Sequence, residues 1–280
     1  MDMNTSTSAS GASRTLFFDV DGTIIYHEPG GDVGETVAKA RPSEGVARAF
    51  RELRARGHMP FICTGRPLTL IAESLLALEP AGIISSAGAC VSVGERVLFD
   101  RSIDIELIDR LLGISERSSV PVLFEGTRGD AAYVPQGVDY RSGGSFSVVR
   151  SRDEMERRVG LSFAKFVIEN DNLEAFTRED PAIFESYFDG FDLGLGISEY
   201  TVRGVDKGYC VRHALECLGR GIEGTIAFGD SENDLPMAGA VETFIAMGNA
   251  MPAVKERAAY VTDSVQDDGV VTALEHFGLI

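Results

Sequence analysis

The segment TLFFDVDGT, residues 15–23, decides the fold class. Its first four residues form an apolar run without polar alternation, which is typical of a strand buried on both faces of a parallel sheet. Asp19 and Asp21 follow this run directly, and Gly22 lets the chain turn behind them. Ligands of open α/β sheets bind beyond the carboxyl ends of the strands, so we expect both carboxylates at a ligand-binding edge. A turn with exposed aspartates is the alternative, but such a turn requires no second carboxylate.

Helices and strands alternate on both sides of this segment. The expected elements are a helix over residues 42–56, a strand over 58–63, a helix over 67–78, a strand over 82–85, a helix over 208–218, and strands over 224–229 and 243–247. This order predicts an α/β fold with a doubly wound, mostly parallel, Rossmann-like core sheet.

In the middle of the chain the order of the expected helices and strands is different. The sequence there predicts a hairpin over residues 91–99, a helix over 103–115, strands over 120–124, 131–134 and 163–169, and a helix over 173–188. Such a mixture indicates an inserted α+β domain. We therefore predict a disordered tail over 1–14, a core over 15–87 and 193–280, and a cap over 88–192.

The composition is acidic. The chain of 280 residues carries 43 Asp and Glu against 26 Lys and Arg, a formal net charge of -17. This charge argues against nucleic acid or an anionic membrane as the main partner, since both require a basic face. We expect no transmembrane helix and no secretory signal. The four cysteines have no metal-binding spacing, so we expect buried, reduced thiols and a cytoplasmic location.

A second group of polar side chains follows the strand expected over 224–229. The segment GDSENDL, residues 229–235, holds three carboxylates and an amide within five positions. Such hard oxygen ligands suit Mg²⁺. A calcium loop does not fit, because Leu235 stands where that loop needs a glycine. A polar helix start, with an aspartate or serine as N-cap, stays open as the alternative.

Two weaker signals accompany these groups. Thr64 and Gly65 stand at the end of the second strand, where a hydroxyl and backbone N–H groups before a helix can hold phosphate. Lys207 precedes a helix and is one of only four lysines. An ammonium fits a phosphate as a point charge. A capped turn and a solvated surface lysine are the ordinary alternatives.

Together the four segments resemble the motifs of the haloacid dehalogenase superfamily of phosphohydrolases, in its Cof-like, type-IIB branch. The family's D-x-D-G-T motif is found at residues 19–23, its Thr or Ser at Thr64, its Lys at Lys207, and its G-D-x-x-N-D motif at residues 229–234. The inserted domain lies between Thr64 and Lys207, where type-IIB members carry their cap. One position departs from the branch, because Ala87 stands where asparagine is usual. That departure puts the substrate contacts there in doubt, but not the chemistry.

The resemblance implies a Mg²⁺-dependent phosphatase that acts on a small phosphorylated metabolite, such as a sugar phosphate or a phosphorylated cofactor. A sugar phosphomutase of the same fold and a non-catalytic binding protein are the alternatives, and the oligomeric state stays open. The implied roles are Asp19 as the nucleophile that forms an aspartyl-phosphate, Asp21 as the acid and base, Asp19, the Asp21 carbonyl and Asp230 as metal ligands, Thr64, Gly65, Lys207 and Asn233 as phosphate-binding groups, and Asp234 as an outer group that orients them.

Overall fold

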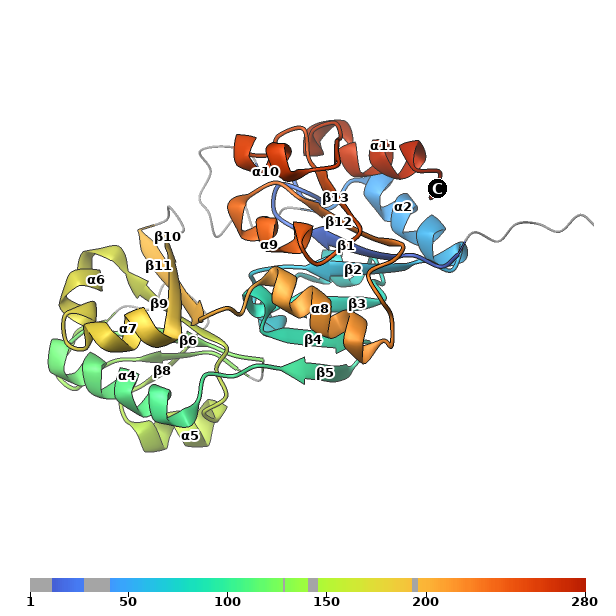
Figure 1. Cartoon of the computed structure of the whole chain (residues 1–280). Coiled ribbons are helices and arrows are strands. Elements are labelled where there is room, and N and C mark those ends of the chain that lie inside the picture. Colours follow the sequence, from blue (N-terminus) through green and yellow to red (C-terminus); the bar gives the residue numbers. More distant parts are fainter. Residues whose placement is uncertain (1–11, 28–40, 128, 141–145, 193–195) are drawn as a thin grey trace, which may run out of the picture.

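The computed structural model describes residues 12–27, 41–127, 129–140, 146–192 and 196–280. These residues form two sheets, each with its own helices (Figure 1). The larger sheet has the strand order β14-β13-β12-β1-β2-β3-β4-β5. Its strands are β1 (Thr15–Asp19), β2 (Met59–Cys63), β3 (Gly82–Ser85), β4 (Cys90–Val93), β5 (Arg96–Asp100), β12 (Thr225–Gly229), β13 (Thr243–Ala246) and β14 (Tyr260–Val261).

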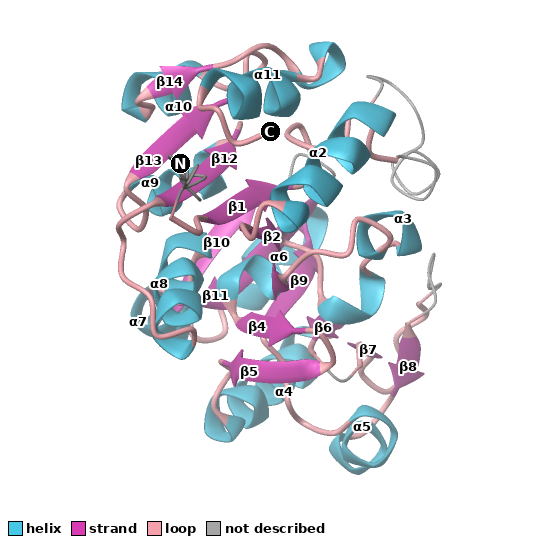
Figure 2. Cartoon of the chain, turned by 90° about the vertical axis from the view of Figure 1, so that its right-hand side faces the viewer, coloured by secondary structure: helices cyan, strands magenta, loops and turns pink. Residues whose placement is uncertain are grey.

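The strand β1 lies at the centre of the larger sheet. It pairs in parallel with β2 on one side and with β12 on the other. The helix α2 (Glu44–Ala55) contacts β2 and α11 (Gly269–His276), whereas α8 (Lys207–Cys217) contacts β3, β4 and β5. The helices α9 (Leu235–Ala238) and α10 (Pro252–Arg257) also belong to this part. The predicted doubly wound, mostly parallel α/β core is confirmed (Figure 2).

Aromatic packing fixes the relative position of the central strands. Phe18 in β1 is fully buried and stacks on Phe228 in β12, with 4.7 Å between the ring centroids. Phe50 of α2 packs against Phe18 at 4.9 Å. The last residues of β1 and β12 are thereby held side by side, and the residues that follow them emerge at one edge of the sheet.

The smaller sheet has the strand order β10-β11-β9-β6-β7-β8. Its elements are α4 (Ile105–Ser118), β6 (Val122–Glu125), β7 (Ala131–Tyr133), β8 (Ser147–Val149), α5 (Arg152–Val159), β9 (Lys165–Glu169), α6 (Asn170–Thr177), α7 (Pro181–Tyr187), β10 (Phe188–Asp192) and β11 (Ile197–Val202). In Figure 1, α4, α6 and α7 lie on the side of this sheet that is turned away from the larger sheet. Phe166 of β9 packs among the aromatic rings on that side.

Three charged side chains are buried within the smaller sheet. The ammonium of Lys165 lies 2.9 Å from Glu125 Oε2 and also contacts Glu199. All three residues are less than 10 % exposed. Burial alone would lower the pKa of Lys165, but the two carboxylates outweigh that effect and raise it. The lysine therefore stays charged and holds β6, β9 and β11 together.

The two sheets divide the chain differently from the predicted boundaries. The hairpin of β4 and β5 pairs antiparallel to β3 and so belongs to the larger sheet, although the cap was predicted to begin at residue 88. The strand β11 pairs with β9 and β10 and so belongs to the smaller sheet, although the core was predicted to resume at residue 193. A strand pattern predicts a strand but does not specify which sheet edge accepts it, because that pairing is not local.

The structure also differs locally from the expected elements. The predicted helix over 67–78 is a short 3-10 helix, Leu68–Leu70, followed after extended residues by α3 (Glu73–Leu76). The predicted helix over 173–188 divides at Pro181, which begins α7 as its first residue. Residues 1–11 of the predicted tail lie outside the described residues, whereas Ser13 donates a hydrogen bond to Gly57.

Two further expectations concern membranes and thiols. Within the described part of the chain, no helix combines the length and the apolar character that crossing a membrane requires. All four cysteines are free. Three are buried as expected, but Cys217, the last residue of α8, is exposed.

Candidate active site

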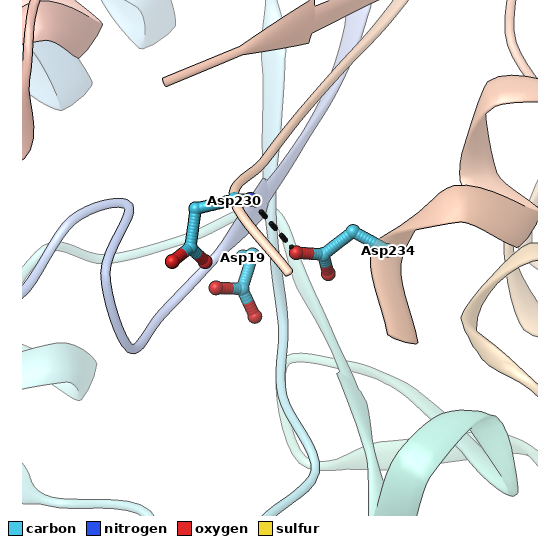
Figure 3. Close-up of side chains that lie close together, drawn as sticks. All are labelled: Asp19, Asp230 and Asp234. Atoms are coloured by element: carbon cyan, nitrogen blue, oxygen red, sulfur yellow. Dashed lines mark hydrogen bonds between the residues drawn. The ribbon is translucent and has the colours of Figure 1, made fainter. Parts of the chain in front are cut away.

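Three carboxylates converge at the carboxyl edge of the larger sheet (Figure 3). Asp19 ends β1, and Asp230 directly follows β12. Asp234 follows four residues later, in the turn that leads into α9. One oxygen atom of each side chain lies within 4.8 Å of the other two. The parallel pairing of β1 with β12 therefore brings together residues that are more than 200 positions apart in sequence.

The turn after β1 has no room for a side chain at Gly22. The backbone has φ +89° there, which disfavours residues with a Cβ atom. A Cβ atom at this position would lie only 2.2 Å from Asp230 Oδ2. The side chain of Asn249 donates to the carbonyl of Gly22 over 2.8 Å and fixes the turn from the other side. Glycine thus allows the two halves of the carboxylate group to approach each other.

Lys207 lies among these carboxylates. Asp206 caps α8 by accepting from Tyr209 N over 2.7 Å, and this places Lys207 at the first residue of the helix. The ammonium donates to Asp19 Oδ1 and to Asp234 Oδ1, each over 2.6 Å. Burial alone would lower the pKa of Lys207, but the two carboxylates raise it well above its usual range. The side chain is therefore a permanent cation at the catalytic edge.

One ammonium does not balance three carboxylates. Burial, with Asp234 as the next cause, raises the pKa of Asp19 well above its usual range. The same two causes raise the pKa of Asp230 to about 7. Its Oδ1 atom is buried and has no hydrogen-bond partner in the part of the chain that the structure describes. Such a group favours a divalent cation, because added positive charge lowers the cost of keeping the carboxylates ionised.

Asp234 is already committed to protein partners. Its Oδ2 atom accepts from the backbone N–H groups of Asp230 and Ser231, over 2.9 and 3.1 Å, and its Oδ1 atom accepts from Lys207. Asp19 and Asp230 are thus better placed than Asp234 to hold a cation, and Asp234 orients their surroundings. The ammonium of Lys207 also lies 3.3 Å from the side-chain oxygen of Asn233.

Thr64 and Gly65 directly follow β2 in the sequence and lie at the same edge of the sheet. Thr64 is buried and its hydroxyl accepts from Arg66 N over 3.2 Å. A Cβ atom added at Gly65 would meet no atom of the described residues within 4 Å. The chain does not enter the predicted helix at residue 67, and the extended backbone of Pro67 leads into the 3-10 helix instead. Residues 64–66 therefore lie in a loop, in which Thr64 N already donates to Ile84 O over 2.9 Å and Arg66 N donates to the Thr64 hydroxyl.

Two residues at this edge were not predicted from the sequence. Arg66 donates to Asp21 Oδ1 over 2.6 Å, and His27 Nε2 lies 2.5 Å from the same oxygen. Arg66 directly follows Thr64 and Gly65 in the sequence. A cationic residue next to a predicted phosphate-binding loop is a signal by which it could have been predicted. His27 is brought back beside Asp21 by the turn in which Ile25 N donates to Val20 O. No sequence pattern predicts that this turn brings His27 next to Asp21.

Comparison with known proteins identifies the family. A family model described as haloacid dehalogenase-like hydrolase matches residues 16–274. The chain belongs to this family. The predicted membership is thus confirmed, and the protein is a hydrolase.

Curated relatives cover nearly the whole hydrolase. A Bacillus subtilis protein named "Putative phosphatase YkrA" is 29 % identical over 96 % of this chain and 99 % of its own length. A phosphoglycolate phosphatase of Methanothermobacter thermautotrophicus is 26 % identical over 94 % of this chain and 98 % of its own length.

Solved structures share the fold of the hydrolase. The subclass IIB sugar phosphatase BT4131 superposes with a TM-score of 0.73 at 24 % identity, over 96 % of this chain and 100 % of that protein. The protein TM0651 from Thermotoga maritima gives 0.76 at 22 % identity, over 94 % and 97 %. At this identity the likeness concerns the fold, and it agrees with the predicted type-IIB arrangement of core and cap.

Proposed function

We propose that this hydrolase is a Mg²⁺-dependent phosphatase that cleaves a phosphate monoester of a small metabolite through an aspartyl-phosphate. The observation that carries the proposal is the surroundings of Asp19. Its carboxylate ends the central strand, contacts Lys207 over 2.6 Å, and lies beside Asp230. A buried carboxylate with a fixed cation and a second acidic group at a sheet edge is suited to nucleophilic attack on phosphorus.

In the first step, an oxygen of Asp19 attacks phosphorus. The bond from phosphorus to the ester oxygen breaks, and its electron pair stays with that oxygen. Asp21 donates a proton to the same oxygen, so that the leaving group departs as an alcohol. The proposed phosphate-binding groups are the hydroxyl of Thr64, the backbone of Gly65, and the side chains of Lys207 and Asn233. They would stabilise the charge on the transferring phosphoryl oxygens.

In the second step, the aspartyl-phosphate is hydrolysed. Asp21 is now a carboxylate and takes a proton from the attacking water. The new bond from oxygen to phosphorus releases Asp19 as a carboxylate and frees inorganic phosphate. Asp21 ends the cycle protonated, as it began, so that no further reactant is needed.

The proposed metal ligands are Asp19, Asp230 and the backbone carbonyl of Asp21. The Asp230 Oδ1 atom has no hydrogen-bond partner within the described ranges, and this supports the choice together with the raised pKa values of Asp19 and Asp230. When bound, Mg²⁺ supplies positive charge that offsets the repulsion between the nucleophilic carboxylate and an anionic phosphate. Asp234 would orient Lys207 through the 2.6 Å contact described above.

The smaller sheet is proposed as the cap that excludes water and selects the substrate. Asp130, in the loop after β6, accepts from the hydroxyl of Thr69 over 2.9 Å, so this loop reaches the 3-10 helix that follows Arg66. The relatives' names mention different substrates, and we therefore propose a small phosphorylated metabolite as the class. We also propose a cytoplasmic location, which the four free thiols support.

The test is release of phosphate from p-nitrophenyl phosphate. We expect steady turnover with Mg²⁺, loss of turnover in EDTA, and recovery when Mg²⁺ is returned. Asp19→Asn should abolish turnover while far-UV circular dichroism stays unchanged. Steady turnover by Asp19→Asn would refute the role of the nucleophile. Trace release with strong activation by a sugar bisphosphate would indicate the phosphomutase instead. A screen of phosphorylated metabolites would then identify the substrate.

A further inference from the structure

The carboxyl group of Asp21 is held by one oxygen only. Arg66 Nη2 lies 2.6 Å and His27 Nε2 lies 2.5 Å from Oδ1, and no contact of Oδ2 with the described residues is seen. The two donors come from different elements, because Arg66 follows β2 whereas His27 follows the turn behind β1. The side chains of Arg66 and His27 are 14 % and 25 % exposed, whereas that of Asp21 is 43 % exposed. The two side chains that hold Asp21 are therefore more buried than the side chain of Asp21 itself.

The chemistry of the donors determines which oxygen can carry a proton. A guanidinium only donates, so the oxygen that faces Arg66 must accept. When the His27 ring carries a proton on Nε2, that N–H donates to the same oxygen, so that Oδ1 accepts two hydrogen bonds. His27 Nδ1 is buried without a hydrogen-bond partner, so the bond to Asp21 is the one bond that this ring makes among the described residues. With both donors in place on Oδ1, that oxygen is the less favourable site for a further proton, so the proton of a neutral Asp21 lies on Oδ2.

We propose that His27 is a positioning residue that, together with Arg66, assigns the proton transfer of Asp21 to Oδ2. This inference rests on the proposed function, because it requires Asp21 to act as the acid and base. A single donor on Oδ1 would leave the carboxyl group free to turn about its bond to Cβ. Two donors from separate elements prevent this rotation and keep Oδ2 directed away from Arg66 and His27.

The proton balance of the step follows from this assignment. As the bond from phosphorus to the ester oxygen breaks, the proton moves from Asp21 Oδ2 to that oxygen, and Asp21 becomes a carboxylate. The negative charge that develops on Asp21 is stabilised by the two donors already in place on Oδ1. In the second step the proton of the attacking water returns to Oδ2. His27 keeps its own protons throughout.

The experiment compares two esters that differ mainly in the basicity of the leaving group. Phenyl phosphate releases a more basic oxygen than p-nitrophenyl phosphate, so its cleavage depends more on a well-placed acid. We expect His27→Ala to lower kcat/KM about tenfold further for phenyl phosphate than for p-nitrophenyl phosphate. His27→Gln keeps a side-chain N–H donor and should recover part of that loss.

The matched control is His213→Ala. His213 also pairs with a carboxylate, Glu216, over 2.9 Å, but it belongs to α8, where its ring stacks on Phe99 of β5. Its ratio of kcat/KM values for the two esters should equal that of the wild type. A merely structural role of His27 would lower both esters equally, and that result would overturn the proposal, as would an unchanged ratio. A wild type that releases phosphate from neither ester in Mg²⁺ would instead overturn the proposed function, and this inference with it.

Discussion

Replacing Asp230 by asparagine is expected to stabilise the metal-free protein while it abolishes activity. The carboxylate of Asp230 lies in a group of three carboxylates that faces one ammonium, and its Oδ1 atom has no hydrogen-bond partner among the described residues. Asparagine keeps the shape of the side chain but removes its charge. The substitution therefore relieves a cost that the metal-free protein bears and removes a proposed ligand of Mg²⁺.

The magnitude follows from the pKa of Asp230. Burial and the neighbouring Asp234 raise it from 3.8 to about 7. Each pKa unit corresponds to about 1.4 kcal/mol, so keeping Asp230 ionised costs the folded state at most about 4 kcal/mol. Water at this edge reduces the cost, and we expect about 2–4 kcal/mol at pH 8.

The sign follows from proton binding. Between the unfolded pKa of Asp230 and its folded value of about 7, the folded state binds more protons than the unfolded state. The free energy of unfolding contributed by this group therefore falls as the pH rises through that window. Below the window the wild type and Asp230→Asn should be equally stable with respect to this group, and above it the variant should be the more stable.

The assay is urea unfolding in EDTA at several pH values between 5 and 8.5. Far-UV circular dichroism is the suitable probe, because the chain has no tryptophan. The quantity of interest is the difference between the wild type and Asp230→Asn, in which contributions from titrating groups that do not interact with Asp230 cancel. Added Mg²⁺ at pH 8 should stabilise the wild type and leave the variant nearly unchanged. A variant no more stable than the wild type at pH 8 in EDTA would refute the reasoning.

Four further substitutions test other parts of the structure. Lys165→Met removes the ammonium from between two buried carboxylates and should lower the free energy of unfolding by about 3–5 kcal/mol, measured by urea unfolding. Ala87 has left-handed backbone angles, φ 55° and ψ 26°, so Ala87→Gly should stabilise by about 0.5–1 kcal/mol, whereas Ala89→Gly, at φ −88°, should destabilise. Gly22→Ala places a Cβ atom against Asp230, and it should cost about 1–3 kcal/mol and raise the Mg²⁺ concentration needed for half-maximal activity.

The elements that could be predicted from the sequence are those whose pattern reflects burial on both faces. The apolar run before Asp19 predicts a central strand, and the run before Asp230 predicts another. Parallel strands present their carboxyl ends at one edge, so the meeting of these two aspartates follows from the fold class alone. Lys207 required the resemblance to the family, because a lysine before a helix has no distinctive pattern of its own.

The features that were not predicted depend on contacts between distant segments or on the course of a turn. The hairpin of β4 and β5 joins the larger sheet because the edge of β3 is available to it. The sequence of the hairpin alone does not predict that it pairs with this edge. The helix predicted after Pro67 gives way to extended residues at Ile71 and Ala72, although its apolar spacing is that of a helix. The approach of His27 to Asp21 is set by the path of a tight turn, which spacing in sequence does not reveal.

The two sheets have separate hydrophobic cores, which has a consequence for how the protein can change over evolutionary time. No buried side chain among the described residues belongs to both cores, and only a small group of Ala89, Ala164 and Val205 forms a third cluster. A mutation that repacks the rings around Phe166 therefore has no direct packing route to Phe18 and the strand end that carries Asp19. New binding preferences can arise in one half of the molecule while the bond-breaking machinery in the other half is inherited unchanged.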